Sequence, residues 1–566
     1  MSATINATSV DDTAVHETTD TELASLVTRE SKRSRRSDVG SRSIPVSRRR
    51  WWLVGGVVAV VWSLRDAGVG SRPQVNGRGW SLVGKFLHGA LRPVMPTGFW
   101  HATFVTLSYA VVGTVLSVVI GAVVGVMVAE ASWRKRLASS ERERRAGWLI
   151  MRALLAVPRG IHEAVWGLLL VNVLGLDPLV GVLAIAIPFG AITAKVYADL
   201  LDEEAGGLYC TLRAGGSSRR NALLYGAVPT TAADLVSYGF YRFECSIRSA
   251  AVLGLIGAGG LGFQLKQAFD GLDYGRMWFV IDALVALSLL GEVWSAFLRR
   301  GRSRRSGRSR RAARGSVIVA IAAFVAAVRF LHIDPTTPWS ARTRDLAARI
   351  GRQAWPPKLP DGGWRAIATA VRETVQMSLL AIVIAATVAA VVSVVWSRDL
   401  TGHSRVAQGV GALVRLVALL ARAVPPSAWA LLVVFVVFPG PLPGAIALAI
   451  YTFGVLARLF SEAMENVDHR PAQALRLLGS SRPTTFAYGV LPIVTPKWQA
   501  YSLYRWEVAA RETVIVGMVG AGGLGRVLSR QVTAFDYRAM VVTLGALIAM
   551  TLLVDLVSAA ARRAFR

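Results

Sequence analysis

Residues 241–265 read YRFECSIRSAAVLGLIGAGGLGFQL, and residues 504–528 read YRWEVAARETVIVGMVGAGGLGRVL. These segments belong to a longer match between residues 238–277 and residues 501–540, in which 16 of 40 positions are identical without a gap. The second copy follows the first by 263 positions. Because repetition on this scale reflects a structural unit that occurs more than once, the chain is predicted to contain two homologous halves.

The composition indicates that the repeated unit lies in a membrane. Of the 566 residues, 53% are hydrophobic and 17% are charged, whereas soluble domains contain about 25% charged residues. The apolar residues gather in blocks, and a helix needs about 20 such residues to cross a bilayer. The predicted spans are residues 51–64, 102–130, 148–172, 179–200, 226–256 and 276–298, then 316–331, 371–396, 410–438, 441–463, 490–519 and 539–560. The predicted fold class is an all-α membrane protein of about 12 transmembrane helices in two six-helix halves, not a soluble enzyme.

Charged segments divide the chain and set its orientation. Residues 1–47 are polar without apolar periodicity, which predicts a disordered cytosolic tail. The basic linker RRGRSRRSGRSRRAARG at residues 299–315 separates two predicted membrane units, residues 48–298 and residues 316–566. Lys and Arg concentrate on the side of the tail and the linker, so both termini are predicted to be cytosolic. This placement also explains the net charge of +29 without a nucleic-acid partner.

The loop between the fourth and fifth predicted spans carries a second repeated motif. Residues 209–229 read YCTLRAGGSSRRNALLYGAVP, and residues 472–492 read AQALRLLGSSRPTTFAYGVLP. Glycine after a helical run suits a left-handed C-terminal cap, and the next serine can cap a following helix. Each loop is therefore predicted to form a short helix with a sharp bend; an ordinary connection between spans is the alternative. The candidate residues are Leu212, Arg213, Gly216, Ser217, Leu475, Arg476, Gly479 and Ser480.

These motifs resemble those of a known family. The loop segment resembles the coupling loop of ATP-binding-cassette (ABC) importer permeases, which docks on a cytosolic ATPase. The Tyr-Arg-Phe/Trp-Glu…Gly-Ala-Gly-Gly-Leu-Gly segments are similar to the signature of phosphonate permeases, as are the Asp-Tyr pairs at residues 273–274 and 536–537. Residues 159–166 (RGIHEAVW) and 422–429 (RAVPPSAW) are similar to that family's Arg-x-Ile-Pro-Glu-x-Val-Trp. The resemblance implies a type I ABC importer permease fold, with two permease units fused in one chain.

The chain departs from the family pattern at three positions. Cys210 and Gln473 replace the glutamate of the coupling loop, and His162 stands where the family tends to have proline. These changes bear on the strength of coupling at each loop and not on the architecture.

The resemblance also implies partners and a location. The partners implied are two copies of an ABC ATPase subunit, which use ATP and Mg²⁺, and an extracytoplasmic phosphonate-binding protein. The implied substrate is a phosphonate or a related oxyanion, phosphite or phosphate, and the implied location is a bacterial plasma membrane, with lipid around the chain. The chain has no GxxxxGK[ST] phosphate loop, so it is predicted to bind no cofactor itself and not to be an enzyme.

The fifth predicted span of each half carries charged residues at membrane depth, where such residues usually face the bundle interior or an aqueous path. They are Arg242, Glu244 and Arg248 in the first half and Arg505, Glu507 and Arg511 in the second. The acid and the second arginine of each set stand four positions apart, so they are predicted to pair on one helix face. One interpretation is that these pairs only stabilise the bundle. The other adds that the first arginine of each set lines a central path for a phosphonate, whose oxygen geometry guanidinium groups match.

The glycine string that follows each charged span also matches the GxGxxG dinucleotide fingerprint. That fingerprint requires a strand before it and a helix after it, whereas here it follows a predicted membrane span. We therefore interpret the glycines as sites of tight helix packing or of a re-entrant turn along the path, with a gating role as a further hypothesis. They are Gly257, Gly259, Gly260, Gly262, Gly520, Gly522, Gly523 and Gly525.

Two other classes of protein remain open. A secondary transporter driven by an ion gradient can also contain two parallel six-helix halves, and uptake that persists without ATP but collapses with the gradient would favour it. A membrane scaffold that recruits partners through its basic tail and linker would be excluded by transport in vesicles. The seven histidines show no metal-binding spacing, and no nucleophile motif is present; neither a metal site nor a catalytic residue is predicted.

Overall fold

The computed structural model describes residues 46–68, 75–77, 79–130, 141–204, 207–302, 307–396, 405–438 and 440–565. Residues 57–566 form one compact unit, separate from residues 1–56. The predicted tail lies outside the described residues except for residues 46 and 47, which begin a helix. Within the described ranges, extended pairing is limited to one isolated bridge between Val75 and Val437.

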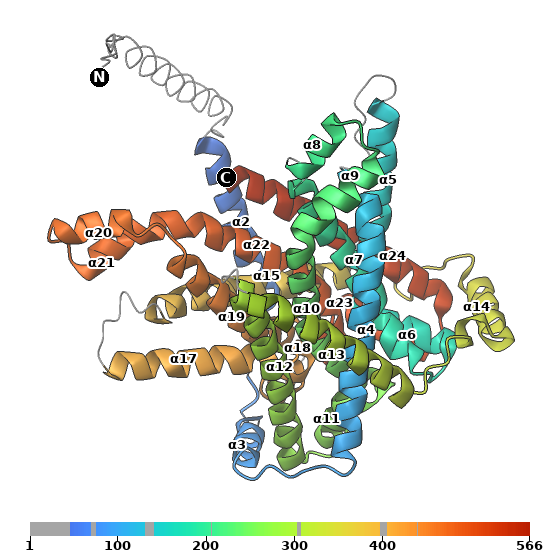
Figure 1. Cartoon of the computed structure of the whole chain (residues 1–566). Coiled ribbons are helices and arrows are strands. Elements are labelled where there is room, and N and C mark those ends of the chain that lie inside the picture. The colour runs from blue at the N-terminus through green and yellow to red at the C-terminus, as the bar shows by residue number, and fades with distance from the viewer. Residues whose placement is uncertain are drawn as a thin grey trace, which may run out of the picture. The chain divides into compact units, whose positions relative to one another are not determined.

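The helices follow the same order in each half (Figure 1). The first half contains α2 (Val46–Asp66), α3 (Gly79–Gly89), α4 (Phe99–Val128), α5 (Glu141–Gly160), α6 (Glu163–Leu174), α7 (Leu179–Glu204), α8 (Leu208–Ala214), α9 (Arg219–Ala222), α10 (Val228–Leu253), α11 (Gly260–Asp270) and α12 (Tyr274–Arg302). The second contains α13 (Gly307–Phe330), α14 (Ala341–Ala354), α15 (Gly363–Trp396), α17 (Arg405–Ala423), α18 (Pro426–Val436), α19 (Pro441–Glu465), α20 (Arg470–Leu477), α21 (Arg482–Thr485), α22 (Leu491–Val516), α23 (Gly523–Thr533) and α24 (Tyr537–Phe565). Single π-helical turns occupy Leu223–Ala227, Gly254–Ala258, Phe486–Val490 and Gly517–Ala521, and a 3₁₀ turn occupies Thr337–Trp339.

The described helices confirm the all-α membrane class. Six of them are long and apolar enough to cross a membrane, namely α4, α7, α12, α15, α19 and α24. Four bent pairs pass the same test together, which raises the count to as many as ten. The two remaining predicted spans fall in α2 and α13; residues 315–330 of α13 form only a shorter apolar helix.

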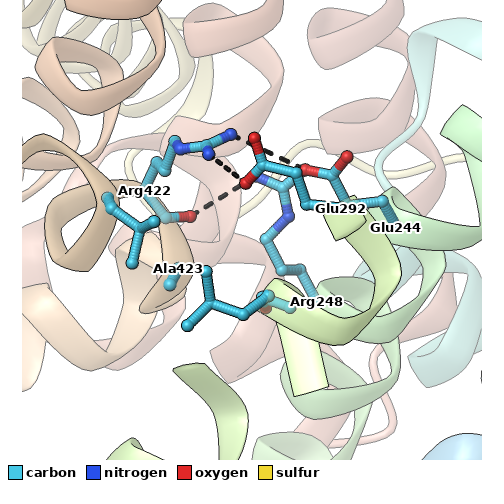
Figure 2. Close-up of a pocket in the computed structure, with 8 residues that line it drawn as sticks. Glu244, Arg248, Glu292, Arg422 and Ala423 are labelled. Atoms are coloured by element: carbon cyan, nitrogen blue, oxygen red, sulfur yellow. Dashed lines mark hydrogen bonds and ion pairs between the residues drawn. The ribbon is translucent and has the colours of Figure 1, made fainter. Parts of the chain in front are cut away.

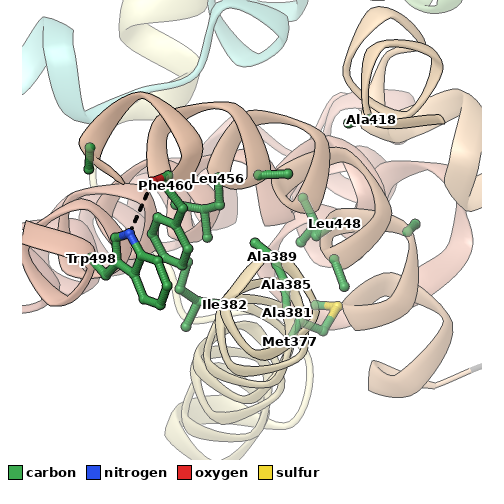
Figure 3. Packing of buried hydrophobic residues seen from close by; sticks show 14 of the residues in the cluster. Met377, Ala381, Ile382, Ala385, Ala389, Ala418, Leu448, Leu456, Phe460 and Trp498 are labelled. Carbon is green, nitrogen blue, oxygen red and sulfur yellow. Dashed lines mark hydrogen bonds between the residues drawn. The ribbon is translucent and has the colours of Figure 1, made fainter. Parts of the chain in front are cut away.

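Small residues allow the central helices of each half to pack closely. In the second half, α15 presents Met377, Ala381, Ala385 and Ala389 to α19 and α22, a spacing of four that keeps them on one helix face (Figure 3). Trp498 of α22 stacks on Phe460 of α19 with ring centroids 4.8 Å apart. In the first half α4 lies beside α7, and a Cβ on Gly121 would come within 2.4 Å of Thr193. Such small-residue contacts are the usual means of helix association in lipid.

One membrane element in each half is broken near its middle. Helices α5 and α6 meet at an angle of 83°, and α17 and α18 meet at 99°. Pro425 lies in the second break and cannot continue a helix. His162 occupies the matching position in the first break, where its side chain instead accepts a hydrogen bond from the backbone N–H of Ala164. The motif that resembles Arg-x-Ile-Pro-Glu-x-Val-Trp is thus the sequence of this break.

The glycine strings form a second pair of breaks, between α10 and α11 at 58° and between α22 and α23 at 65°. Gly257 and Gly520 lie at the turns with φ of 104° and 124°, a region that favours glycine. A Cβ on Gly262 would lie 1.8 Å from the carbonyl oxygen of Ala251. The strings therefore bend each helix, with backbone packed closely against backbone at the bend.

Substituting alanine for Gly262 is expected to destabilise the protein by about 1–3 kcal/mol, the usual cost of forcing an extra methyl group into a packed site. Gly545 provides the matched control because a Cβ there meets nothing within 4 Å. Its replacement by alanine is expected to be neutral or stabilising inside helix α24. Thermal unfolding of the purified variants measures both effects, and equal midpoints for the two variants would contradict the packing role of Gly262.

Candidate functional site

Helices α10 and α22 carry the six charged residues predicted to line a path. Arg242, Glu244 and Arg505 are buried, and Arg248, Glu507 and Arg511 are partly buried. The two helices belong to different halves. Some of the charged residues contact their own half, and some contact the other half. These contacts separate the six residues into two groups.

Arg248 and Arg511, which are equivalent in the repeat, each reach across to the other half. Arg248 Nη1 donates to the carbonyl oxygen of Arg422 at 3.4 Å. Arg511 Nη1 donates to the carbonyl oxygen of Arg159 at 3.1 Å. Arg159 and Arg422 are themselves equivalent and end the first helix of each broken pair. The contact is therefore reciprocal between the halves.

An ionic cluster surrounds the first of these contacts (Figure 2). Arg422 pairs with Glu292 of α12 and lies 3.8 Å from Glu244. Glu292 also accepts from Arg458 of α19 at 2.5 Å, and Glu244 lies 3.5 Å from Arg248. A small pocket lies among these side chains, between α10 and α12 of the first half and α17 of the second. We call this set of residues the first clamp.

The equivalent cluster on the other side, the second clamp, is smaller. Arg159 pairs with Asp555 of α24 at 3.2 Å. Glu507 accepts from Arg562 at 2.5 Å, and Arg511 bonds backbone carbonyl oxygens rather than Glu507's carboxylate. The predicted pair at i,i+4 therefore forms in the first half and not in the second, because Glu507 has a closer partner one helix away.

Sequence reasoning found Glu244 and Glu507 but missed the other acid of each clamp. Glu292 and Asp555 stand 263 positions apart and lie within α12 and α24, among apolar residues. The repeat alone would have found them, since an acid at the same position of both last spans stands out against an apolar helix. Arg458 and Arg562 also have basic equivalents 263 positions earlier, Lys195 and Arg299, so the repeat could have pointed to them as well.

Within the described part of the chain, Arg242 and Arg505 differ from the other four charged residues because each guanidinium keeps donors that make no hydrogen bond. Both side chains are more than nine-tenths buried, with 6% and 8% exposure. The Nε and Nη2 atoms of each make no hydrogen bond. The Arg242 guanidinium lies 3.7 Å from the centroid of the Phe189 ring, and that of Arg505 lies 5.5 Å from the centroid of the Tyr451 ring. Buried donors without partners are rare in proteins and call for an explanation.

The two arginines also share the same pair of tyrosines. Arg242 and Arg505 each lie within electrostatic range of both Tyr241 and Tyr504. The tyrosines remain 45% and 54% exposed, although the arginines that follow them in the chain are buried. The Tyr-Arg pairs of the two halves therefore lie near one another, and among the described residues the Nε and Nη2 donors of both guanidiniums make no hydrogen bond. This arrangement is suited to an oxyanion.

The two predicted coupling loops have the same local structure. Gly216 and Gly479 follow α8 and α20 with φ of 88° and 81°, which confirms the left-handed caps. The helix that follows is capped by the second serine of each Gly-Ser-Ser-Arg, Ser218 and Ser481, whose side chains accept from the backbone N–H three positions on. The prediction that the serine next to the glycine, Ser217 or Ser480, caps this helix is therefore wrong. Its N–H bonds back to the preceding helix instead, as the N–H of Ser480 does to the carbonyl oxygen of Leu475 at 3.0 Å.

These loops present much of their surface to solvent. Leu477 and Leu478 are 89% and 82% exposed, and Leu208 is 49% exposed. Leu477 and Leu478 lie at the end of α20, and Leu208 begins α8. Within the part of the chain that the structure describes, no three His, Cys, Asp or Glu side chains lie where they could hold a metal ion.

Comparisons with known proteins agree with a duplicated membrane unit. A family model described as binding-protein-dependent transport system inner membrane component matches residues 121–304 and again residues 407–566, more than half of the chain. The phosphate-import permease protein PhnE of Mycolicibacterium smegmatis is 29% identical over 394 residues, which are 69% of this chain and 72% of that protein. The phosphite transport system permease protein PtxC of Stutzerimonas stutzeri is 32% identical over 252 residues, 44% of this chain and 89% of that protein. The double match confirms the predicted duplication.

A chain of the MetNI methionine ABC transporter, solved in inward-facing conformations, aligns with a TM-score of 0.34 at 17% identity. The alignment covers 37% of this chain and 100% of that chain.

Proposed function

Because the chain belongs to the family of inner membrane components of binding-protein-dependent transport systems and carries this component twice, we propose that it is the permease of an importer for a phosphorus oxyanion. Members of the family are the multi-pass membrane subunit of ABC transporters, in which a separate ATPase hydrolyses ATP and a binding protein delivers the substrate. This chain is therefore the transport path and not the ATPase.

The observation that supports this choice of substrate is that Arg242 and Arg505 are buried and that their Nε and Nη2 donors make no hydrogen bond among the described residues. A phosphonate, phosphite or phosphate offers several charged oxygens at once, and guanidinium groups bind such oxygens through paired hydrogen bonds. The names of the two relatives, a phosphate and a phosphite permease, support the same class. The substrate would pass between the halves and satisfy the donors that the protein leaves open.

The remaining parts of the proposal concern assembly. Two copies of the ATPase subunit would dock on α8–α9 and α20–α21, whose exposed leucines and bent glycine caps suit a helix held in a cleft of a partner. Both termini and the basic linker at residues 299–315 would lie in the cytosol, with residues 1–47 as a tail and residues 48–298 and 316–566 as the two permease units. Movement of the ATPases would then separate and close the halves around the arginines.

Reconstitution into lipid vesicles together with the ATPase and the binding protein tests this function. We expect ATP-driven uptake of phosphite that excess methylphosphonate or phosphate suppresses and that dissipation of ion gradients leaves unchanged. A coupling-loop variant, Gly216→Val with Gly479→Val, provides an uncoupled control, since valine is strained at positive φ. Uptake that requires an ion gradient and not ATP would overturn the proposal in favour of a secondary transporter.

A further inference from the structure

The two halves differ at a buried position close to Arg242 and Arg505. Seven residues after Arg242 the first half has Ser249, whereas seven residues after Arg505 the second half has Glu512. Seven residues are about two helical turns, so each of these residues lies on the same face of its helix as the arginine. Ser249 and Glu512 are both buried, with 4% and 8% exposure.

The first half places its buried acid elsewhere. Ser249 Oγ donates to Glu163 Oε1 at 2.6 Å, and the other carboxylate oxygen of Glu163 lies 2.9 Å from His162 Nδ1. The residue of the second half that matches Glu163 is Pro426. Among the described residues, each half therefore has one buried acid that the other half lacks, Glu163 in the first and Glu512 in the second. Of these two acids, only Glu512 lies within ion-pair distance of Arg242 or Arg505 in the part of the chain that the structure describes.

The contact between Arg505 and Glu512 is an ion pair without hydrogen bonds. Arg505 Nη2 lies 3.6 Å from Glu512 Oε2, beyond hydrogen-bond distance. Glu512 Oε2 and the Nε and Nη2 atoms of Arg505 all lack hydrogen-bond partners. Attraction between buried charges repays their loss of hydration only when hydrogen bonds complete the pair. A ligand oxyanion that supplies those bonds can therefore replace the carboxylate.

Arg242 has no such pair: among the described residues, no carboxylate lies within ion-pair distance of it. It contacts the ring of Phe189 instead. An anion that arrives between the halves thus meets the Arg242 guanidinium, whose charge no carboxylate offsets among the described residues. It also meets the Arg505 guanidinium, whose charge Glu512 already offsets.

We propose, on the basis of the proposed function, that Glu512 is an internal counter-ion that a tetrahedral phosphorus oxyanion displaces from Arg505. The oxyanion binds Arg242 first and then competes with Glu512 for Arg505. When the oxyanion leaves, the carboxylate returns to the guanidinium. Such competition keeps the affinity of the path moderate, and a transport path needs moderate affinity because a ligand that binds too tightly is not released. Glu512 is in this sense a positioning residue for substrate release.

Two opposite substitutions test the role of Glu512 in the complete permease–ATPase complex, held in lipid nanodiscs. The readout is the thermal unfolding midpoint during titration with phosphite, because a ligand that binds the folded state raises the midpoint. Glu512→Gln, with Glu512→Ser as a second form, is expected to lower the phosphite concentration for half of the maximal rise by about tenfold. Ser249→Glu, which gives Arg242 a counter-ion of its own, is expected to raise that concentration by a similar factor.

The uptake assay in vesicles provides the second readout. Glu512→Gln is expected to lower the maximal rate of phosphite uptake while it tightens binding, a combination that a purely structural role would not produce. Glu465→Gln removes an exposed acid of α19 and is expected to change neither quantity.

Two results would overturn the inference. One is that the phosphite concentration for half of the maximal rise is unchanged in both Glu512 variants while wild-type uptake is normal. That result would leave the proposed function intact. The other is that this phosphite concentration is unchanged in Ser249→Glu. If the Glu512 variants fail to fold, the Ser249→Glu result alone tests the inference. Failure of the wild-type complex to take up phosphite, methylphosphonate and phosphate would instead overturn the proposed function.

Discussion

Replacement of both Arg242 and Arg505 by glutamine is expected to reduce ATP-driven phosphite uptake to background. Each guanidinium offers charge-assisted hydrogen bonds worth about 1.5–3 kcal/mol, so either replacement alone is expected to lower uptake about 10- to 150-fold. Glutamine retains a polar side chain but loses the charge and the paired donors. The measurement is the initial rate of uptake into vesicles that contain the complete transporter.

Two controls separate the loss of anion binding from the loss of structure. Lysine at both positions keeps the charge without the planar fork, and we expect it to restore part of the uptake. Arg530→Gln removes an exposed arginine of α23 and is expected to leave uptake unchanged. Normal uptake by the double glutamine variant, with normal assembly, would exclude the two arginines from the path.

Glu292→Gln is expected to destabilise the protein by about 3–5 kcal/mol, since it leaves two arginines of the first clamp without their common carboxylate. Arg422 and Arg458 both bind Glu292. The equivalent change in the second clamp, Asp555→Asn, is expected to cost about 1–3 kcal/mol, because Asp555 binds only Arg159 among the described residues. Denaturation of the two purified variants in the same detergent gives the comparison.

A double variant provides the internal check for the first clamp. Glu292→Gln combined with Arg422→Gln is expected to be more stable than the sum of the single effects, because the second change removes a charge that the first leaves unpaired. Equal losses of stability in Glu292→Gln and Asp555→Asn would show that the two clamps contribute alike.

Much of the architecture follows from the sequence. The repeat predicted the two halves because equivalent positions share the same residue type, as Arg242 and Arg505 do. In the structure these two residues are also buried alike. The glycine strings and the Gly-Ser-Ser-Arg loops were predictable because positive φ and helix capping are local properties of a few residues. The breaks beside Arg159 and Arg422 were not predicted: residues 148–172 and 410–438 were each expected to form one span, whereas the structure bends them by 83° and 99°.

The partners of the charged residues were less predictable, since they depend on the packing of helices far apart in sequence. Spacing along one helix predicted that Glu507 pairs with Arg511, yet Arg562 of the neighbouring helix lies closer. Spacing alone also cannot reveal that Arg248 and Arg511 bond backbone oxygens of the opposite half. Distances between helices are set by the small residues at their contacts, and these determine which charges meet.

The reciprocal clamps bear on how the molecule would behave if it were cut in two. A contact in which residue i of one copy meets residue j of the other, and j meets i, is isologous, the kind found in dimers of identical subunits. Two copies of the first half would place Arg159 opposite Glu292 twice, with the same charges that the fused chain uses. The covalent connection therefore does more than hold the halves at high effective concentration. It excludes such self-pairing and ensures that each transporter contains Glu512 once.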